Sequence, residues 1–178
     1  MNVAFEPLPN LANLLRRTVA ANHVRNLVIV EAVVGRSVGT ASIAAMADSA
    51  YSHVIDGANE IDNRHGKWSS VSVRAVTVDD YVANVVGRLP RLIKMDIEGS
   101  EIEAIEGAKE VLSHPDGPDV ICEVGEPHLA RFNHTPAELF DKFAALGYRP
   151  LNPRTKEPMR LEDLSDAEYN VFFSKRNR

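Results

Sequence analysis

Short apolar runs alternate with helical patterns along most of the chain. The runs have the length and composition of buried strands, and they cover residues 2–6, 27–34, 92–97, 118–124 and 170–174. Two other segments repeat their apolar positions at helical spacing, and Asn10 and Thr135 are placed to cap these helices. The alternation of strands and helices predicts an α/β fold, with a sheet wrapped by helices in a single domain over residues 1–178.

The first half of the chain contains a long polar stretch between strand patterns. Residues 27–34 are almost continuously apolar, which is typical of a parallel strand buried on both faces. Residues 39–45 and 71–78 alternate loosely like strands. Between them, residues 48–70 are polar and have no periodicity. We expect this segment to be a polar loop or insertion that is mobile or covers a cleft.

Residues 91–112 join a strand to a helix through an acidic turn. The strand is followed by Asp96, Glu98 and Gly99, and the pattern then becomes helical. Ligands of open α/β sheets bind outside the carboxyl ends of the strands. We therefore expect Asp96, Glu98 and Glu101 to converge where a ligand would lie. Alternatively, Glu98 and Glu101 only cap the helix and favour its positive end.

The helix in this segment has a predicted cap and two unlike faces. Ser100 and Glu103 have the spacing of a capping box. Glu101 lies on the apolar side in the first turn, aimed back at the strand. The core-facing positions are Ala104, Ile105, Ala108, Val111 and Leu112. The positions expected to point to water are Glu103, Glu106 and Glu110.

Further polar residues follow the strand at 118–124. This strand ends at Glu123, and the loop after it carries His128, Arg131 and His134 above the same edge of the sheet. No two of the six histidines are four residues apart on a convincing helix, so the sequence does not favour a zinc site.

The composition is that of an ordinary soluble domain. Of the 178 residues, 44% are hydrophobic and 25% are charged, and the net charge of -5 disfavours nucleic acid as a partner. No uncharged apolar run approaches the roughly 20 residues of a membrane helix, so we expect no membrane association and a cytoplasmic protein. The single cysteine, Cys122, cannot form an internal disulfide.

The segment Lys94–Glu101 reads Lys-Met-Asp-Ile-Glu-Gly-Ser-Glu. It resembles the K-x-D-x-E-G-x-E signature of the FkbM family of S-adenosylmethionine-dependent methyltransferases. The resemblance continues in order through residues 3–7, residues 78–80 and Glu123. It implies a Rossmann-like methyltransferase sheet, S-adenosylmethionine as the cofactor, and a hydroxyl of a sugar, glycan or secondary metabolite as the methyl acceptor.

The resemblance also implies roles for single residues. Glu6, at the end of the first strand of this chain, would hydrogen-bond the adenosine ribose, and the adenine ring would lie near Ala32. Asp96 would be the base or the group that orients the acceptor, while Glu98 and Glu101 would support it or contact the cofactor's ammonium group. The alternatives are that Glu6 is a surface acid beside a turn and that Ala32 is plain core.

The sequence departs from the family pattern at its start. Relatives begin with a strand and a D-x-G-A-x-x-G loop that holds the methionine end of the cofactor, whereas Met1 directly precedes what corresponds to the family's second strand, and the chain contains no G-x-G. The resemblance therefore implies an N-terminally truncated sheet without its central strand. The chain is then a fragment, or its flanking strands pair directly, or another chain fills the gap in an oligomer. A non-catalytic remnant without cofactor binding is the alternative function.

We predict that the chain over residues 1–178 binds S-adenosylmethionine weakly. The family's loop would offer backbone N–H groups to the cofactor's carboxylate, and hydrogen bonds to charged groups contribute about 1.5–3 kcal/mol each. Without two of them, binding should weaken by about 3–6 kcal/mol, or roughly a hundredfold to ten-thousandfold. Calorimetric titration measures this, and tight stoichiometric binding would contradict the prediction.

Overall fold

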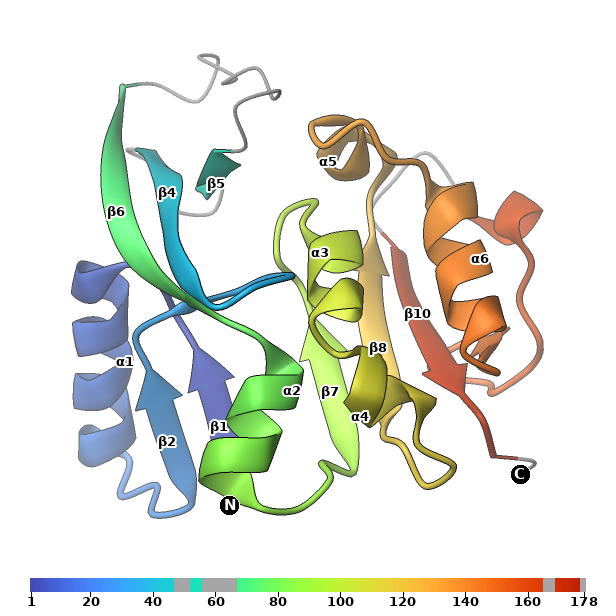
Figure 1. Ribbon diagram of the computed structural model, residues 1–178, viewed down its shortest axis with the longest axis horizontal. Helices are drawn as coiled ribbons and strands as arrows, with labels where there is room; N and C mark the ends of the chain where they lie inside the picture. The colour runs from blue at the N-terminus through green and yellow to red at the C-terminus, as the bar shows by residue number, and fades with distance from the viewer. Residues whose placement is uncertain (47–51, 56–66, 165–168, 177–178) are drawn as a thin grey trace.

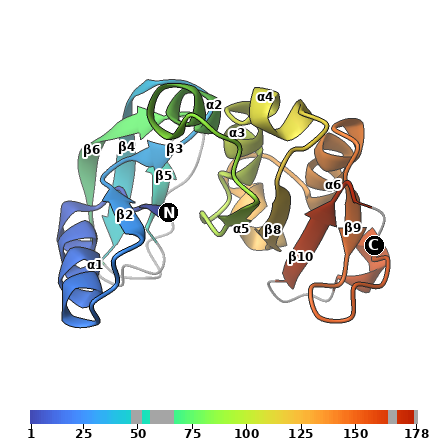
Figure 2. The same ribbon diagram turned by 90° about the horizontal axis from the view of Figure 1, so that it is seen from below.

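The computed structural model describes residues 1–46, 52–55, 67–164 and 169–176. These residues form a mixed α/β fold in which the strands are arranged in three sheets (Figure 1). The α/β class expected from the alternating pattern is confirmed. Seen from below, the elements up to β6 lie in one half of the molecule and those from β7 onward lie in the other (Figure 2).

The first sheet has two parallel strands. β1 (Asn2–Phe5) pairs with β2 (Leu27–Val30), and α1 (Pro9–Ala21) connects them. The helix begins at Pro9 and not after Asn10, so the predicted Asn10 cap is wrong. Proline fits the first helical position because its fixed φ is already helical and its missing N–H would have no partner there.

The apolar run at 27–34 divides between two sheets. After β2 the chain turns, and β3 (Val33–Val34) pairs in parallel with β6 (Trp68–Val76). Val28 in β2 is 42% exposed. The prediction of one strand buried on both faces is therefore wrong, because the apolar pattern did not reveal the change of partner at Ala32.

The second sheet has the strand order β3-β6-β4-β5. β4 (Gly39–Met46) pairs antiparallel with both β6 and β5 (His53–Ile55). The polar-loop prediction for 48–70 is thus wrong at 53–55 and 68–70, which are strand residues. The rest of that segment, except Ser52 and Lys67, lies outside the described residues.

The third sheet has the strand order β7-β8-β10-β9. β7 (Leu92–Met95) and β8 (Asp119–Val124) are parallel. β10 (Tyr169–Ser174) runs antiparallel between β8 and β9 (Arg149–Leu151). The strands predicted at 92–97, 118–124 and 170–174 are confirmed with small changes of boundary.

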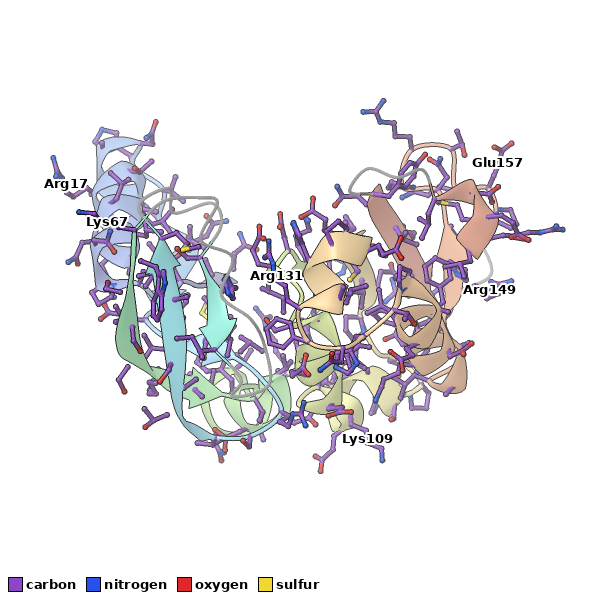
Figure 3. The ribbon with its side chains drawn as sticks, turned by 90° about the horizontal axis from the view of Figure 1, so that it is seen from above. Arg17, Lys67, Lys109, Arg131, Arg149 and Glu157 are labelled. Carbon is purple, nitrogen blue, oxygen red and sulfur yellow. The ribbon has the colours of Figure 1, made fainter. Side chains whose placement is uncertain are left out.

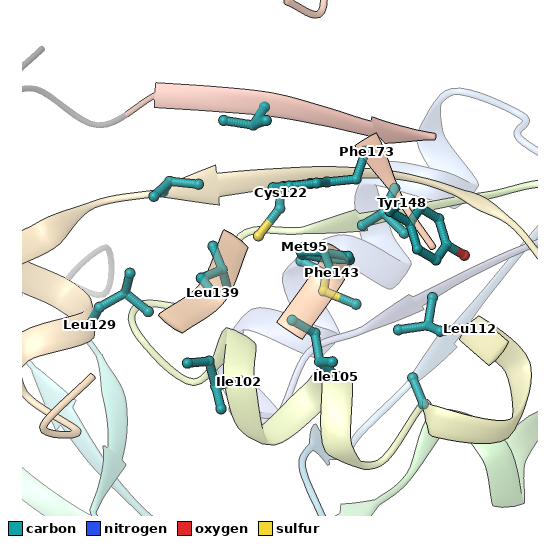
Figure 4. Close-up of a cluster of buried hydrophobic side chains, with 14 of the residues drawn as sticks. Met95, Ile102, Ile105, Leu112, Cys122, Leu129, Leu139, Phe143, Tyr148 and Phe173 are labelled. Atoms are coloured by element: carbon teal, nitrogen blue, oxygen red, sulfur yellow. The ribbon is translucent and has the colours of Figure 1, made fainter. Parts of the chain in front are cut away.

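Helices cover this sheet and form the largest apolar core with it (Figure 4). α6 (Pro136–Ala145) begins with the predicted Thr135 cap, and its Phe143 ring stacks on Phe173 of β10 at 3.9 Å between centroids. The helix predicted over 101–112 is instead two short helices, α3 (Glu101–Glu106) and α4 (Lys109–Ser113). Two other short elements are α5 (Glu126–Ala130) and a 3-10 turn, η4 (Leu161–Asp163).

The connection between the two halves follows β6. α2 (Val78–Tyr81) continues into a π-helical segment, η3 (Val82–Val86), which ends at Gly87 with a left-handed φ of 68°. The carboxylate of Asp79 accepts hydrogen bonds from the backbone N–H groups of Glu110 and Val111, both at 2.9 Å. Since Ala108 precedes α4 without a capping side chain, Asp79 caps that helix from a distant part of the sequence.

None of the helices in the described ranges has the length and apolar character needed to cross a lipid bilayer.

We predict that Asp79→Ala lowers the free energy of unfolding by about 1–3 kcal/mol, because two N–H groups of α4 lose a charged acceptor. Urea unfolding measures the change. Asp80→Ala is the matched control, since the exposed Asp80 carboxylate accepts a hydrogen bond from the exposed Asn84 amide and the substitution should change stability by about 0.5 kcal/mol or less. Equal effects of the two substitutions would remove the capping role of Asp79.

Candidate functional site

Asp96 immediately follows β7 at the carboxyl edge of the third sheet. Its side chain is 49% exposed, and its Oδ2 lies 3.2 Å from the Lys94 ammonium. A hydrogen bond with the Glu123 side chain is the main cause of a pKa below the ordinary aspartate value, partial burial opposes this shift, and Lys94 adds to it. The site therefore contains an accessible carboxylate that is ionised at neutral pH.

The contact between Asp96 and Glu123 follows from strand register. Met95 of β7 pairs with Cys122 of β8, so the next residue of each strand carries one of the two carboxyl groups. A hydrogen bond between two carboxyl groups requires one proton. This hydrogen bond lowers the pKa of Asp96 and so favours its ionised form.

Glu98 lies in the turn after β7 and contacts α5. Its Oε2 is 3.3 Å from His128 Nδ1 and 3.4 Å from an Arg131 guanidinium nitrogen. Its φ is +57°, a conformation that is uncommon for a residue with a side chain. The sequence placed His128 and Arg131 above this edge of the sheet, and the structure pairs both with Glu98. The alternative that Glu98 only caps the helix does not account for these two contacts.

Gly99 allows the acidic turn to pack directly on α5. Its φ is +106°, and a Cβ at this position would collide with the backbone carbonyl of His128 and touch the Phe132 ring. A glycine is therefore required by both the backbone conformation and the close approach.

Glu101 is 3% exposed and points back into the turn, as predicted. Its Oε1 accepts hydrogen bonds from the backbone N–H groups of Ile97 at 3.2 Å and Gly99 at 3.4 Å. Burial raises the pKa of Glu101 above the ordinary glutamate value, while these hydrogen bonds oppose the shift. The predicted capping box is absent, because the Ser100 hydroxyl donates to the Ile97 carbonyl at 2.8 Å instead of accepting from the helix.

Glu103 does not point to water, so that prediction is wrong. It is 9% exposed, and its Oε1 accepts from Arg36 at 2.7 Å and contacts His134 Nε2 at 3.0 Å. Arg36 lies 67 residues earlier, so no local pattern could reveal this pair. The prediction holds for Glu106 and Glu110, which are exposed.

The two residues proposed to bind the cofactor lie in the other half of the molecule. Glu6 follows β1, and its Oε1 accepts from the Leu8 N–H at 2.8 Å. Partial burial raises the pKa of Glu6, and this hydrogen bond opposes the shift. Ala32 is fully buried beside Val30 and Val76, so its side chain is covered in this structure. Their roles toward ribose and adenine stay predictions.

β1 and β7 line opposite sides of a groove of about 750 Å³. α2 and η3 contribute to the same groove, and Asp96 is among its lining residues. Figure 3 shows the molecule from above, with Arg131 on the half that carries α5 and Arg17 and Lys67 on the other half. Among the described residues, no group of three or more His, Cys, Asp or Glu side chains is arranged to hold a metal ion.

The chain matches the Methyltransferase FkbM domain family over residues 1–150. Among solved structures it is similar to the methyltransferase FkbM from Methylobacillus flagellatus KT, with a TM-score of 0.53 and 17% sequence identity. The similarity covers 97% of this chain and 36% of that protein, so the chain spans about a third of the length of its solved relative. At this identity the likeness shows the fold alone. No curated protein matches the chain.

We predict that Glu101→Ala lowers the free energy of unfolding by about 2–4 kcal/mol, because the N–H groups of Ile97 and Gly99 lose their acceptor. Glu101→Gln keeps an acceptor oxygen and should change stability by less than about 1 kcal/mol at neutral pH. Urea unfolding compares the variants with Glu110→Ala, a substitution at an exposed position. A stability of Glu101→Ala equal to that of the wild type would contradict the contact.

The raised pKa of Glu101 also predicts how the free energy of unfolding changes with pH. Because burial raises the pKa of Glu101, the folded chain holds this proton at pH values where the unfolded chain has lost it. The resulting stability is complete below the ordinary glutamate pKa of about 4.3 and is lost as the pH rises through the raised value. Glu101→Gln should therefore lose less stability than the wild type over that interval.

Proposed function

The chain belongs to the FkbM methyltransferase domain family, and from that premise we propose that it works as an S-adenosylmethionine-dependent methyltransferase domain. The proposed acceptor is a hydroxyl of a sugar, glycan or secondary metabolite, and the proposed location is the cytoplasm. The observation that best supports this proposal is the ionised, half-exposed Asp96 at the carboxyl edge of the sheet. Ligands of α/β sheets bind at this edge.

The residues present fit the cofactor in part. The Glu6 carboxylate lies at the end of β1, on the same edge as Asp96, and could accept hydrogen bonds from ribose hydroxyls (Figure 1). Its Oε1 already accepts from Leu8, which leaves Oε2 for a ribose hydroxyl. Ala32 would need its covering side chains to move before it could touch an adenine ring. Bound S-adenosylmethionine would supply an electrophilic methyl group on a sulfonium.

The proposed role of Asp96 is to position the acceptor and to attract the proton of its hydroxyl. Methyl transfer is an in-line displacement, so correct placement of the two reacting groups contributes most to the rate. A carboxylate with a lowered pKa is a weak base, and Asp96 should therefore act mainly by orienting the hydroxyl through a charge-assisted hydrogen bond. The Glu123 side chain lies beside it and hydrogen-bonds to it.

Glu98 and Glu101 are proposed to support Asp96. Glu98 binds His128 and Arg131 and so holds the acidic turn against α5. Glu101 accepts two N–H groups within the turn and so fixes its backbone. A contact of either carboxylate with the cofactor's ammonium group is the alternative role. The Glu98 oxygen that pairs with α5 would then have to exchange partners.

A non-catalytic domain is the second candidate function. The sequence has no G-x-G loop, and Ala32 is covered. Equilibrium dialysis with S-adenosylhomocysteine at millimolar concentration distinguishes the candidates, since a methyltransferase domain should retain the ligand weakly but saturably and a domain without cofactor binding should retain none. In either case, the net charge of -5 favours a small-molecule or glycan partner over nucleic acid.

We predict that Asp96→Asn lowers methyl transfer by about a hundredfold or more while the urea midpoint changes little, because the orienting charge is lost from an exposed side chain. Transfer of labelled methyl groups from S-adenosylmethionine to a panel of hydroxylated sugars, glycans and secondary metabolites measures the effect.

The matched control for this prediction is Glu110→Gln, which removes a carboxylate from the exposed side of α4 and should leave transfer unchanged. Glu103→Gln would be unsuitable, since Glu103 binds Arg36 and His134. Wild-type transfer by Asp96→Asn would remove Asp96 from the mechanism.

A further inference from the structure

The carboxyl edge of the third sheet carries three polar side chains in a row on neighbouring strands. Glu123 of β8 pairs directly with Asn170 of β10. Asp96 follows the last residue pair of β7 and β8 and so comes level with Glu123. Because β10 is antiparallel to β8, its first residues lie at the edge where β7 and β8 end. The fold thus brings Asn170 to the same edge as Asp96, although the two are distant in sequence.

The row lies on the face of the sheet opposite α3, α4 and α6. These helices pack on the other face and form the main apolar core with its side chains (Figures 1 and 4). Cys122 and Val171 belong to this core and are fully buried. Since successive side chains of a strand point to opposite faces, Glu123 and Asn170 point away from the core.

Asn170 contributes an unsatisfied polar atom to this row. Its Oδ1 is buried and has no hydrogen-bond partner among the described residues. A buried oxygen without a donor costs free energy, and most such atoms in folded proteins are paired. An apolar residue would fill the position without this cost. The asparagine is therefore better explained by a ligand than by the stability of the fold.

The spacing of the strands indicates what kind of ligand reaches both ends of the row. Neighbouring strands are about 4.8 Å apart, so about 10 Å separates the backbones at Asp96 and Asn170. A carboxylate accepts hydrogen bonds, whereas a carboxamide both donates and accepts them. Hydroxyl groups suit both partners, and at about 2.8 Å from each side chain they must lie on non-adjacent atoms of the ligand. A ring that carries several hydroxyls has this arrangement.

We propose that Asn170 is a specificity-determining residue for the acceptor. Its carboxamide hydrogen-bonds a second hydroxyl of a polyhydroxylated ring whose reacting hydroxyl lies at Asp96. The terminal torsion of an asparagine side chain is soft, so the oxygen can turn toward the bound hydroxyl. Binding then supplies the partner that Oδ1 lacks. This inference rests on the proposed function, which places Asp96 at the reacting hydroxyl.

Nuclear magnetic resonance of the whole chain tests the contact without requiring methyl transfer. The probes are methyl glucoside, methyl galactoside and myo-inositol, with cyclohexanol as a ring that has a single hydroxyl. The side-chain amide signals of Asn170 should shift saturably with at least one polyhydroxylated probe and should not shift with cyclohexanol. No shift with any of the three, or an equal shift with cyclohexanol, would overturn the inference.

Asn170→Leu separates a ligand contact from a structural role. Leucine has a similar size but no polar atoms, so the probe should bind about tenfold or more weakly while the urea midpoint stays the same or rises. Asn13→Leu is the matched control, because Asn13 is exposed on α1, and it should leave probe binding unchanged. If Asn170→Leu does not fold, Asn170→Ala removes the same amide and is judged in the same way. A lowered urea midpoint with unchanged probe binding would show a structural role and overturn the inference.

Acceptor kinetics distinguish failure of this inference from failure of the proposed function. With an acceptor that the wild-type chain methylates, Asn170→Leu should raise the acceptor KM about tenfold or more and leave the KM for S-adenosylmethionine unchanged. Methyl transfer with an unchanged acceptor KM would overturn the inference and keep the proposed function. Probe binding at Asn170 without methyl transfer to any acceptor of the panel would overturn the proposed function and keep the site for a polyhydroxylated ligand.

Discussion

The carboxylate of Asp79 ties the two halves of the molecule together. It follows β6 in sequence, yet it caps α4, which packs in the other half. Beside it, the Asp79 N–H donates to the Gly107 carbonyl, and a Cβ on Gly107 would collide with the carbonyl of Gly35. Within the described residues β1 and β7 do not pair, so the two halves are joined by contacts of this kind and not by a ladder of strand hydrogen bonds.

This constraint also determines which parts of the candidate site are held rigidly. Asp96, Glu98 and Glu101 all lie on one turn, which is packed against α5 through Gly99. Their relative positions depend on contacts within one half of the molecule. Glu6 belongs to the other half, so its distance from Asp96 depends on the connection through Asp79 and on what lies in the groove. The roles proposed for Glu6 toward the cofactor and for Asp96 toward the acceptor should therefore be separable by mutation.

The sequence patterns were most informative where local chemistry decides the structure. The capping box at Thr135 and the inward position of Glu101 depend on residues a few positions apart, and both are present. Helical spacing predicts that Glu103 points to water. This prediction fails because Glu103 binds Arg36, which is distant in sequence and cannot be seen in a local pattern. The run 27–34 has uniform apolarity although its two ends join different sheets. Periodicity reports that a residue is buried, but it does not report which element buries it.

The pairing register of β7 and β8 explains the lowered pKa of Asp96, the aspartate of the family signature. One residue beyond the paired strands, register places Glu123 beside Asp96, and the hydrogen bond between them keeps Asp96 ionised. Lys94 in the same signature contributes an opposite charge 3.2 Å away. Both neighbours make Asp96 a weaker base and a better-oriented acceptor of hydrogen bonds. This environment suits a reaction in which the methyl donor supplies the electrophile and the protein supplies position.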